Sequence, residues 1–218
     1  MALSSLSEGQ RYLIEGPEGK LELVLEPGVE SGPLADSAYY AVVCHPHPLY
    51  GGTMGDQVVA TLASVYRELG VPVVRFNFRG VGASEGEHDK GQGEVDDLCA
   101  VAAWARQQSA GNHLLLAGYS FGSVVAAGSD AALQIEHLTL VAPPVEHYAF
   151  APDGGFRCPA VVILGEQDEL VDFQGTKTWA ANLSSPVKVL GIAGASHFFH
   201  GQSTVLHDQL TPLLLQAL

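Results

Sequence analysis

The sequence predicts an α/β protein, with a mostly parallel central sheet and helices on both faces. Short apolar runs typical of strands alternate with amphipathic helical segments from residue 39 to the C-terminus, the pattern expected of such a sheet. The 218 residues suit one ordinary domain, and 47% hydrophobic with 16% charged residues is a globular composition. We therefore expect a single domain over residues 1–218.

In the first half of the chain we predict a hairpin at 11–27, a polar loop at 27–37, strands at 39–46 and 71–78, and between these strands a helix at 55–70. The hairpin is predicted by two apolar runs around a Gly-Pro and Gly turn. The helix is predicted by apolar residues at helical spacing and by Gly70, a typical stop signal.

In the second half, strands and helices are again predicted to alternate. The predicted strands are at 113–120, 137–144, 160–168 and 187–192, and the predicted helices are at 93–108, 121–133, 173–183 and 202–217. Acidic residues in the first turn of the 93–108 helix suit the helix dipole. Ligands of such folds bind beyond the carboxyl ends of the strands, so the loops that follow the strands are where we expect the functional residues.

The charge balance limits the possible partners. Ten basic residues against 24 acidic ones give a formal net charge of −14, which disfavours binding to nucleic acid. No apolar run approaches the ~18 residues of a membrane span, and the N-terminal stretch lacks a basic region followed by an apolar one. The cysteines are too widely spaced for a disulfide framework or a zinc site. We expect a cytoplasmic monomer or homodimer with no nucleic-acid or membrane partner.

The stretch Gly118-Tyr119-Ser120-Phe121-Gly122 matches G-x-S-x-G between a predicted strand and a predicted helix. A serine on such a sharp turn needs very small residues on either side, and the following helix directs its N-terminus at the site. The alternative is an ordinary strand-to-helix turn with no catalytic role. The context favours Ser120 as a nucleophile.

A serine nucleophile needs a base and a group that orients the base. Asp168 lies at the C-terminal end of a predicted strand, and His197 follows the last strand after the small residues of Gly194-Ala195-Ser196. We favour these two, while other acids and histidines compete for the roles: Glu166, Glu169, Asp172, His200 and His207.

The order serine, acid, histidine with G-x-S-x-G resembles that of the α/β-hydrolases. The stretches CHPHPLYGGTMG and NFRGVGASEGEHDKGQGEVDDL are similar to those of small bacterial members without a lid, distantly similar to dienelactone hydrolases, serine esterases and peptidases. The resemblance extends from about residue 20 to the end. Dienelactone-type enzymes carry cysteine where this chain has Ser120.

The resemblance implies an α/β-hydrolase fold and a serine hydrolase with Ser120 as nucleophile, His197 as base and Asp168 as acid. We expect it to cleave small-molecule carboxylic esters without a cofactor. A thioesterase or peptidase with the same triad, or a low-turnover binding or regulatory protein, stays open. The His-Pro-His segment has no third or fourth ligand at matching spacing, so we expect no metal.

The resemblance also implies an oxyanion hole. One donor is the N–H of Phe121, and the other comes from the loop HPHPLYGG, where prolines are excluded because they have no N–H. His47 is favoured, with Leu49 and Tyr50 as alternatives.

We expect Tyr50, Tyr119, Tyr148 and Phe198 at the substrate pocket, with Phe121 as a further candidate. The resembled loop D-x-R-G-x-G-x-S has Asn77 in place of its aspartate, and Arg79 is expected to tie loop carbonyls together or, alternatively, to bind substrate. Residues 143–159 are too short for a lid, so we expect an open site with Tyr148, Phe150 and Phe156 as an apolar rim or partner patch.

Overall fold

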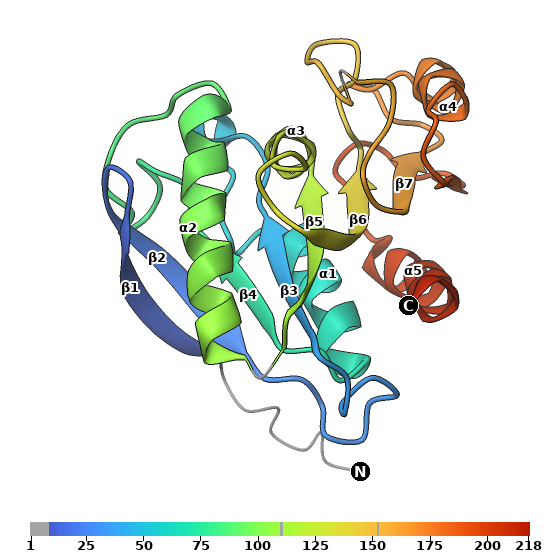
Figure 1. The fold of residues 1–218 in the computed structure, drawn as a ribbon. Coiled ribbons are helices and arrows are strands. Elements are labelled where there is room, and N and C mark those ends of the chain that lie inside the picture. Colours follow the sequence, from blue (N-terminus) through green and yellow to red (C-terminus); the bar gives the residue numbers. More distant parts are fainter. Residues whose placement is uncertain (1–8, 110, 152) are drawn as a thin grey trace.

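The computed structural model describes residues 9–109, 111–151 and 153–218, which form one eight-stranded sheet with five α-helices (Figure 1). The strands are β1 (Gln10–Gly16), β2 (Gly19–Glu26), β3 (Tyr39–Cys44), β4 (Val73–Phe76), β5 (His113–Tyr119), β6 (Ile135–Val141), β7 (Ala160–Gly165) and β8 (Val187–Ile192). The α-helices are α1 (Gln57–Glu68), α2 (Gln92–Gln108), α3 (Phe121–Gly128), α4 (Phe173–Ala181) and α5 (Ser203–Ala217), and a 3₁₀ turn, η1, spans Pro48–Tyr50.

The strand order is β1-β2-β4-β3-β5-β6-β7-β8. The β1–β2 hairpin is antiparallel and joins β4 antiparallel, whereas every pairing from β4 through β8 is parallel. The predicted mostly parallel sheet is therefore confirmed. The carboxyl ends of the parallel strands lie at one edge, which is where the loops of interest gather.

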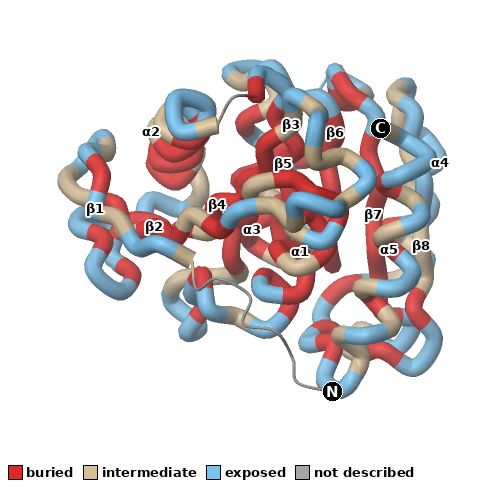
Figure 2. The backbone as a smooth tube through the Cα atoms, turned by 90° about the horizontal axis from the view of Figure 1, so that it is seen from below, coloured by how far each residue is buried: buried red, intermediate tan, exposed pale blue. Residues whose placement is uncertain are grey.

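Alternate residues of the central strands pack into two separate cores. On one face, Val42 and its equivalents pack against α2 and α3. On the other, Val43 and its equivalents pack against α1 and α5. The central strands are buried along their length, while the outer elements carry the exposed residues (Figure 2). This two-sided burial explains why these strands are continuous apolar runs in the sequence.

Helix α3 ends earlier than the sequence predicts, at Gly128 instead of residue 133. The Ser129 hydroxyl donates to the Ala126 carbonyl, and the Ala132 N–H donates to the Ser129 carbonyl in a turn. A glycine followed by serine and aspartate favours such a helix end, because the short polar side chain competes with the helical backbone.

The connection between β6 and β7 is a loop with no helix or strand in its described residues, so the fold has no lid. The prediction of an apolar rim here is wrong for Phe150 and Phe156. Both are buried, with ring centroids 5.7 and 6.2 Å from that of Trp179 on α4. Their burial depends on the docking of α4, which local sequence does not reveal.

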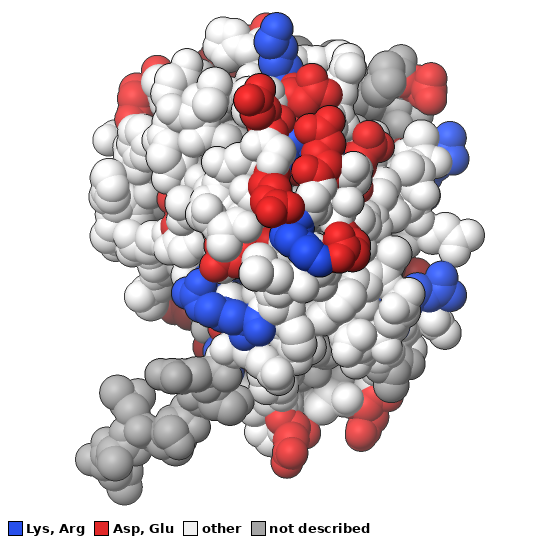
Figure 3. Space-filling model, turned by 90° about the vertical axis from the view of Figure 1, so that its left-hand side faces the viewer, with Lys and Arg blue, Asp and Glu red and all other residues white. Residues whose placement is uncertain are grey.

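Acidic residues outnumber basic ones by 24 to 10. On the face that carries β1 and β2, acidic side chains gather in a band with a few basic ones around it (Figure 3). In residues 9–218 except 110 and 152, no helix is both long and apolar enough to cross a membrane. The first eight residues, which contributed to the prediction of no targeting segment, lie outside the described residues.

Candidate active site

Ser120 lies on the sharp turn between β5 and α3, with φ 52° and ψ −118°. Residues other than glycine rarely adopt a positive φ, so the surrounding structure must enforce this backbone conformation. A Cβ on Gly122 would lie 2.4 Å from the Cys44 carbonyl oxygen, and one on Gly118 would lie 2.2 Å from the Gly122 carbonyl oxygen. Both glycines are therefore required by close backbone approach, as the motif predicts.

The structure brings together the three residues that the sequence predicts as a triad. His197 Nε2 lies 3.0 Å from Ser120 Oγ, and His197 Nδ1 lies 2.9 Å from Asp168 Oδ2. His197 is 4% exposed and the Asp168 side chain 0%, so the pair is shielded from water. In this geometry the imidazole can accept the serine proton while the carboxylate stabilises the resulting imidazolium.

The competing acids have other contacts. Glu166 is exposed, and Asp172 caps α4 by accepting the N–H groups of Gln174 and Gly175. Glu169 accepts the backbone N–H of His197 at 3.1 Å and so supports the histidine loop. Asp168 is itself fixed, because its Oδ1 accepts the N–H groups of Leu170 and Val171.

The competing histidines also lie elsewhere. His200 is exposed and stacks on Phe198 with ring centroids 5.6 Å apart. His207, on α5, lies 3.1 Å from the Glu68 carboxylate and 3.2 Å from that of Asp208.

Tyr119 has a supporting role that the sequence does not reveal. Its hydroxyl donates to the His197 carbonyl at 2.9 Å, and its ring lies 5.6 Å from the imidazole. Burial, with smaller contributions from Asp56, Asp168 and Glu169, raises the pKa of this hydroxyl far above its usual value. Tyr119 is therefore a neutral donor that positions the histidine loop.

The hydrogen bonds of the loop distinguish the candidate oxyanion donors. Leu49 N–H donates to His47 Nδ1, and Tyr50 N–H donates to the His47 carbonyl, so η1 already uses both groups. Within the described residues, the N–H groups of His47 and Phe121 have no hydrogen-bond partner. Phe121 is the first residue of α3, where the helix dipole favours negative charge.

Histidines hold the loop that carries His47. His45 is fully buried, and its Nε2 accepts the Phe78 N–H at 3.0 Å, which ties the loop to the end of β4. Burial lowers the pKa of His45 to about 4, so it is neutral at pH 7. Burial and the nearby His88 lower the pKa of His47 as well, although Glu94 opposes this.

A cavity of about 530 Å³ opens beside Ser120 and His197. Its remaining lining residues are Pro46, His47, Tyr50, Gly51, Gly52, Asp56, Tyr119, Leu170 and Phe198. Three of them are exposed apolar side chains, Tyr50 at 87%, Leu170 at 53% and Phe198 at 48%. They form an apolar rim that differs from the rim the sequence predicts.

Two of the aromatic residues expected at the pocket do not line this cavity. Tyr148 packs against Phe121, with ring centroids 6.2 Å apart. The Phe121 side chain is only 1% exposed, enclosed by the rings of His47, Phe78 and His88. The Phe121 ring is therefore not part of the cavity wall.

Arg79 forms a buried ion pair behind the site. Its Nη2 donates to Asp97 Oδ1 at 2.8 Å and to the Gly93 carbonyl at 2.6 Å. Asn77 accepts the Met54 N–H and donates to Glu22. Both side chains join loops to neighbouring elements, and the 3% exposure of Arg79 agrees with the structural role.

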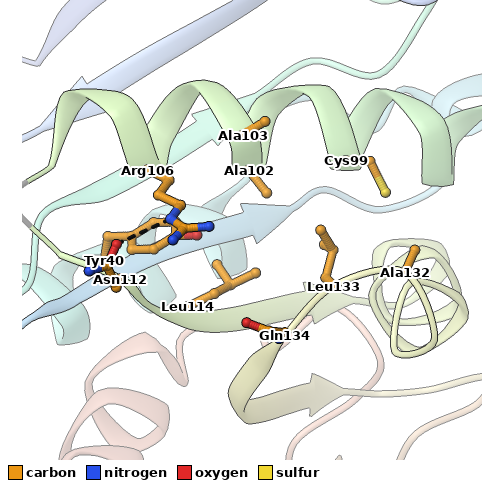
Figure 4. A pocket seen from close by; sticks show the side chains of 10 residues that line it. All are labelled: Tyr40, Cys99, Ala102, Ala103, Arg106, Asn112, Leu114, Ala132, Leu133 and Gln134. Carbon is orange, nitrogen blue, oxygen red and sulfur yellow. Dashed lines mark hydrogen bonds between the residues drawn. The ribbon is translucent and has the colours of Figure 1, made fainter.

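A second cavity, of about 450 Å³, lies at the opposite end of the strands (Figure 4). It is lined from β3, α2 and β5 by residues including Tyr40, Arg106 and Leu114, and Arg106 donates to Asn112. Leu114 lies six positions before Ser120, about 20 Å along extended chain, so this cavity is distinct from the candidate site. Among the described residues, no group of three or more His, Cys, Asp and Glu side chains is placed to hold a metal ion.

Known proteins are similar to this chain over most of its length. Residues 33–153 match the family described as X-Pro dipeptidyl-peptidase (S15 family). The uncharacterized protein RP471 of Rickettsia prowazekii is 35% identical over 84% of this chain and 79% of its own.

Solved structures are also similar to this chain, in both sequence and fold. The structure of an alpha-beta serine hydrolase homologue from Coxiella burnetii is 40% identical, with a TM-score of 0.89 over 97% of this chain and 100% of its own. XC6422 from Xanthomonas campestris, described as an α/β serine hydrolase without lid, is 37% identical, with a TM-score of 0.89 over 97% and 96%. The chain therefore belongs to the S15 family and is a serine hydrolase of the α/β-hydrolase fold without a lid.

Proposed function

We propose that the protein hydrolyses small carboxylic esters through an acyl-enzyme on Ser120. The observation that carries the proposal is the unbroken hydrogen-bond chain from Ser120 Oγ through His197 to Asp168, with separations of 3.0 and 2.9 Å. A serine hydroxyl is a weak nucleophile by itself, and this arrangement provides the base and its orienting acid.

In the first step, His197 Nε2 accepts the hydroxyl proton as Ser120 Oγ attacks the ester carbonyl. The N–H groups of Phe121 and His47 stabilise the oxyanion of the tetrahedral intermediate. His197 then donates the proton to the leaving alcohol. Water attacks the acyl-enzyme in the same way, which releases the carboxylic acid and restores Ser120.

The cavity supports a small ester. Its apolar rim of Tyr50, Leu170 and Phe198 is open, and no lid covers a long acyl chain. Amide cleavage is the second candidate, because the matched family is described as a dipeptidyl-peptidase. Thioesters would react through the same steps.

The test is to measure kcat/KM for p-nitrophenyl esters of two to twelve carbons, matched thioesters and Xaa-Pro-p-nitroanilides, with wild type and Ser120→Ala. We expect the short esters to be hydrolysed best, and Ser120→Ala to reduce their kcat by about 10⁴-fold or more. Preference for the anilides would favour the peptidase. Equal rates for wild type and Ser120→Ala would contradict any mechanism through Ser120.

A further inference from the structure

Asp56 gives the cavity at Ser120 its only acidic or basic lining residue, apart from histidines, among the described residues. No lysine or arginine lines the cavity to neutralise it. The hydrolysis of a simple ester does not require such a group, and the steps above do not use it.

One oxygen of the Asp56 carboxylate is free to interact with a ligand. Oδ1 accepts the Val58 N–H at 2.8 Å and so caps α1. Oδ2 has no hydrogen-bond or ion-pair partner within the described part of the chain. The N-terminus of α1 carries about half a positive charge, so a net negative charge remains at this wall of the cavity.

Neighbouring carboxylates add to this potential. Asp56, Asp168 and Glu169 each act on the hydroxyl of Tyr119 as negative charges. The excess of 24 acidic over 10 basic residues has the same sign. A positively charged group entering the cavity would therefore be stabilised, and a carboxylate repelled.

Aromatic side chains surround the same space. Tyr50, Tyr119 and Phe198 line the cavity together with Asp56. The Tyr50 and Phe198 side chains are 87% and 48% exposed, so their rings are accessible to a ligand. Tyr119 is only 2% exposed, so two rings are accessible beside the carboxylate. This arrangement suits an ammonium group, which interacts favourably with ring faces as well as with the anion.

We propose that Asp56 determines substrate specificity by favouring esters that carry an ammonium group and disfavouring esters that carry a carboxylate. The catalytic part of this inference rests on the proposed function, whereas the binding part does not. The substrate class is thus a small cationic ester.

The test compares esters of matched shape and different charge: the p-nitrophenyl esters of 4-(trimethylammonio)butanoate, of its neutral isostere 5,5-dimethylhexanoate and of glutarate as the monoester, and the acetates of choline and 3,3-dimethylbutanol. We expect Asp56→Asn to reduce the cation-to-neutral ratio of kcat/KM about three- to tenfold in the acyl or the alcohol series, and to raise the relative rate of the glutarate ester. Asparagine caps helices about as well as aspartate, so α1 should persist.

The control is Asp172→Asn, which changes the same kind of helix cap at α4, away from the cavity. We expect it to leave the charge ratios unchanged. Raised NaCl should weaken the wild-type preference, because salt screens it. Ratios that Asp56→Asn leaves unchanged in both series would overturn the proposal.

A binding measurement separates this proposal from the proposed function. Choline and 3,3-dimethylbutanol are titrated by NMR into Ser120→Ala and into Ser120→Ala/Asp56→Asn. We expect choline to bind more tightly than the alcohol, with the difference lost in the double variant. If choline binds preferentially in this way but no ester is hydrolysed by the wild type, the esterase is refuted and the charge preference is retained. If Asp56→Asn leaves the preference for choline over the alcohol unchanged, the charge preference is overturned.

Discussion

The sequence predicts that Ser120, Asp168 and His197 lie together, because each lies at or just after the carboxyl end of a predicted strand, and in a parallel sheet those ends meet at one edge. Glu169 and Tyr119 could not be identified as supports of His197. Each bonds the backbone of the histidine loop, and such contacts depend on how loops far apart in the sequence are packed.

Asp168→Asn tests the charge of the orienting acid. The amide is nearly isosteric with the carboxylate but does not favour the required imidazole tautomer, so we expect kcat to fall about 10³- to 10⁴-fold. The measurement is steady-state hydrolysis of p-nitrophenyl acetate. Glu166→Gln, an exposed acid in the same loop, is the control and should retain activity; an equal loss in both variants would contradict the assignment.

Tyr119→Phe tests the support of the histidine loop. It removes the 2.9 Å hydrogen bond to the His197 carbonyl and keeps the ring. We expect a loss of about 1 to 3 kcal/mol in the free energy of unfolding, because a buried carbonyl loses its partner. Urea unfolding checks this, and Tyr12→Phe, which changes a half-buried tyrosine that packs on Trp104, is the comparison. An unchanged stability would mean that water replaces the bond.

At the scale of elements, the strands and most helices lie where the apolar periodicity predicts them, although individual bounds differ by two or three residues, as for β4 at Val73–Phe76 against the predicted 71–78. The periodicity does not predict where α3 ends or that η1 forms, because both depend on the hydrogen bonds of individual turns. The sequence left three candidates for the second oxyanion donor, and the turn at Pro48–Tyr50 distinguishes them because it uses two of the three N–H groups.

The turn between β5 and α3 requires Gly122. We expect Gly122→Ala to destabilise the fold by about 2 kcal/mol or more, because the added Cβ would meet the Cys44 carbonyl, a backbone atom, at 2.4 Å. Gly55→Ala is the control, where the nearest atom would be Thr53 Oγ1 at an ordinary 3.5 Å. Chemical denaturation of both variants tests this, and similar stabilities would show that the turn can relax.

The Arg79–Asp97 pair holds the loop after β4 against α2, with side-chain exposures of 3% and 1%. Asp97→Ala leaves a buried guanidinium without its partner, and we expect a loss of about 3 to 5 kcal/mol in unfolding free energy. Glu15→Ala, which removes the partner of Lys20 in an exposed pair, should cost less than about 1 kcal/mol. Equal effects in urea unfolding would contradict the structural role of Arg79.

At the scale of the whole molecule, two buried histidines predict how stability depends on pH. Burial lowers the pKa of His45 and of His137 from 6.5 to about 4. Between these values the unfolded chain binds more protons than the native one, so stability is full above pH 6.5 and falls as the pH decreases toward 4. The loss should reach roughly 3 kcal/mol for each histidine.

Urea unfolding at pH 7.5, 6 and 5 measures this slope, with the variant His45→Gln/His137→Gln as the comparison. The variant should be less stable at pH 7.5 but should show a weaker dependence between pH 6.5 and 4. An unchanged slope would mean that other groups dominate the acid sensitivity. The sequence predicts neither histidine as buried and neutral, because burial depends on the assembled sheet.

The central claim is that Ser120 is a nucleophile activated by His197 and Asp168. The most direct measurement is labelling of the intact protein with a fluorophosphonate at pH 7.5, followed by mass spectrometry of the modified peptide. We predict one covalent adduct on Ser120, absent in Ser120→Ala and formed far more slowly in His197→Ala with its fold retained. No adduct on Ser120, or an equal rate in folded His197→Ala, would contradict the account.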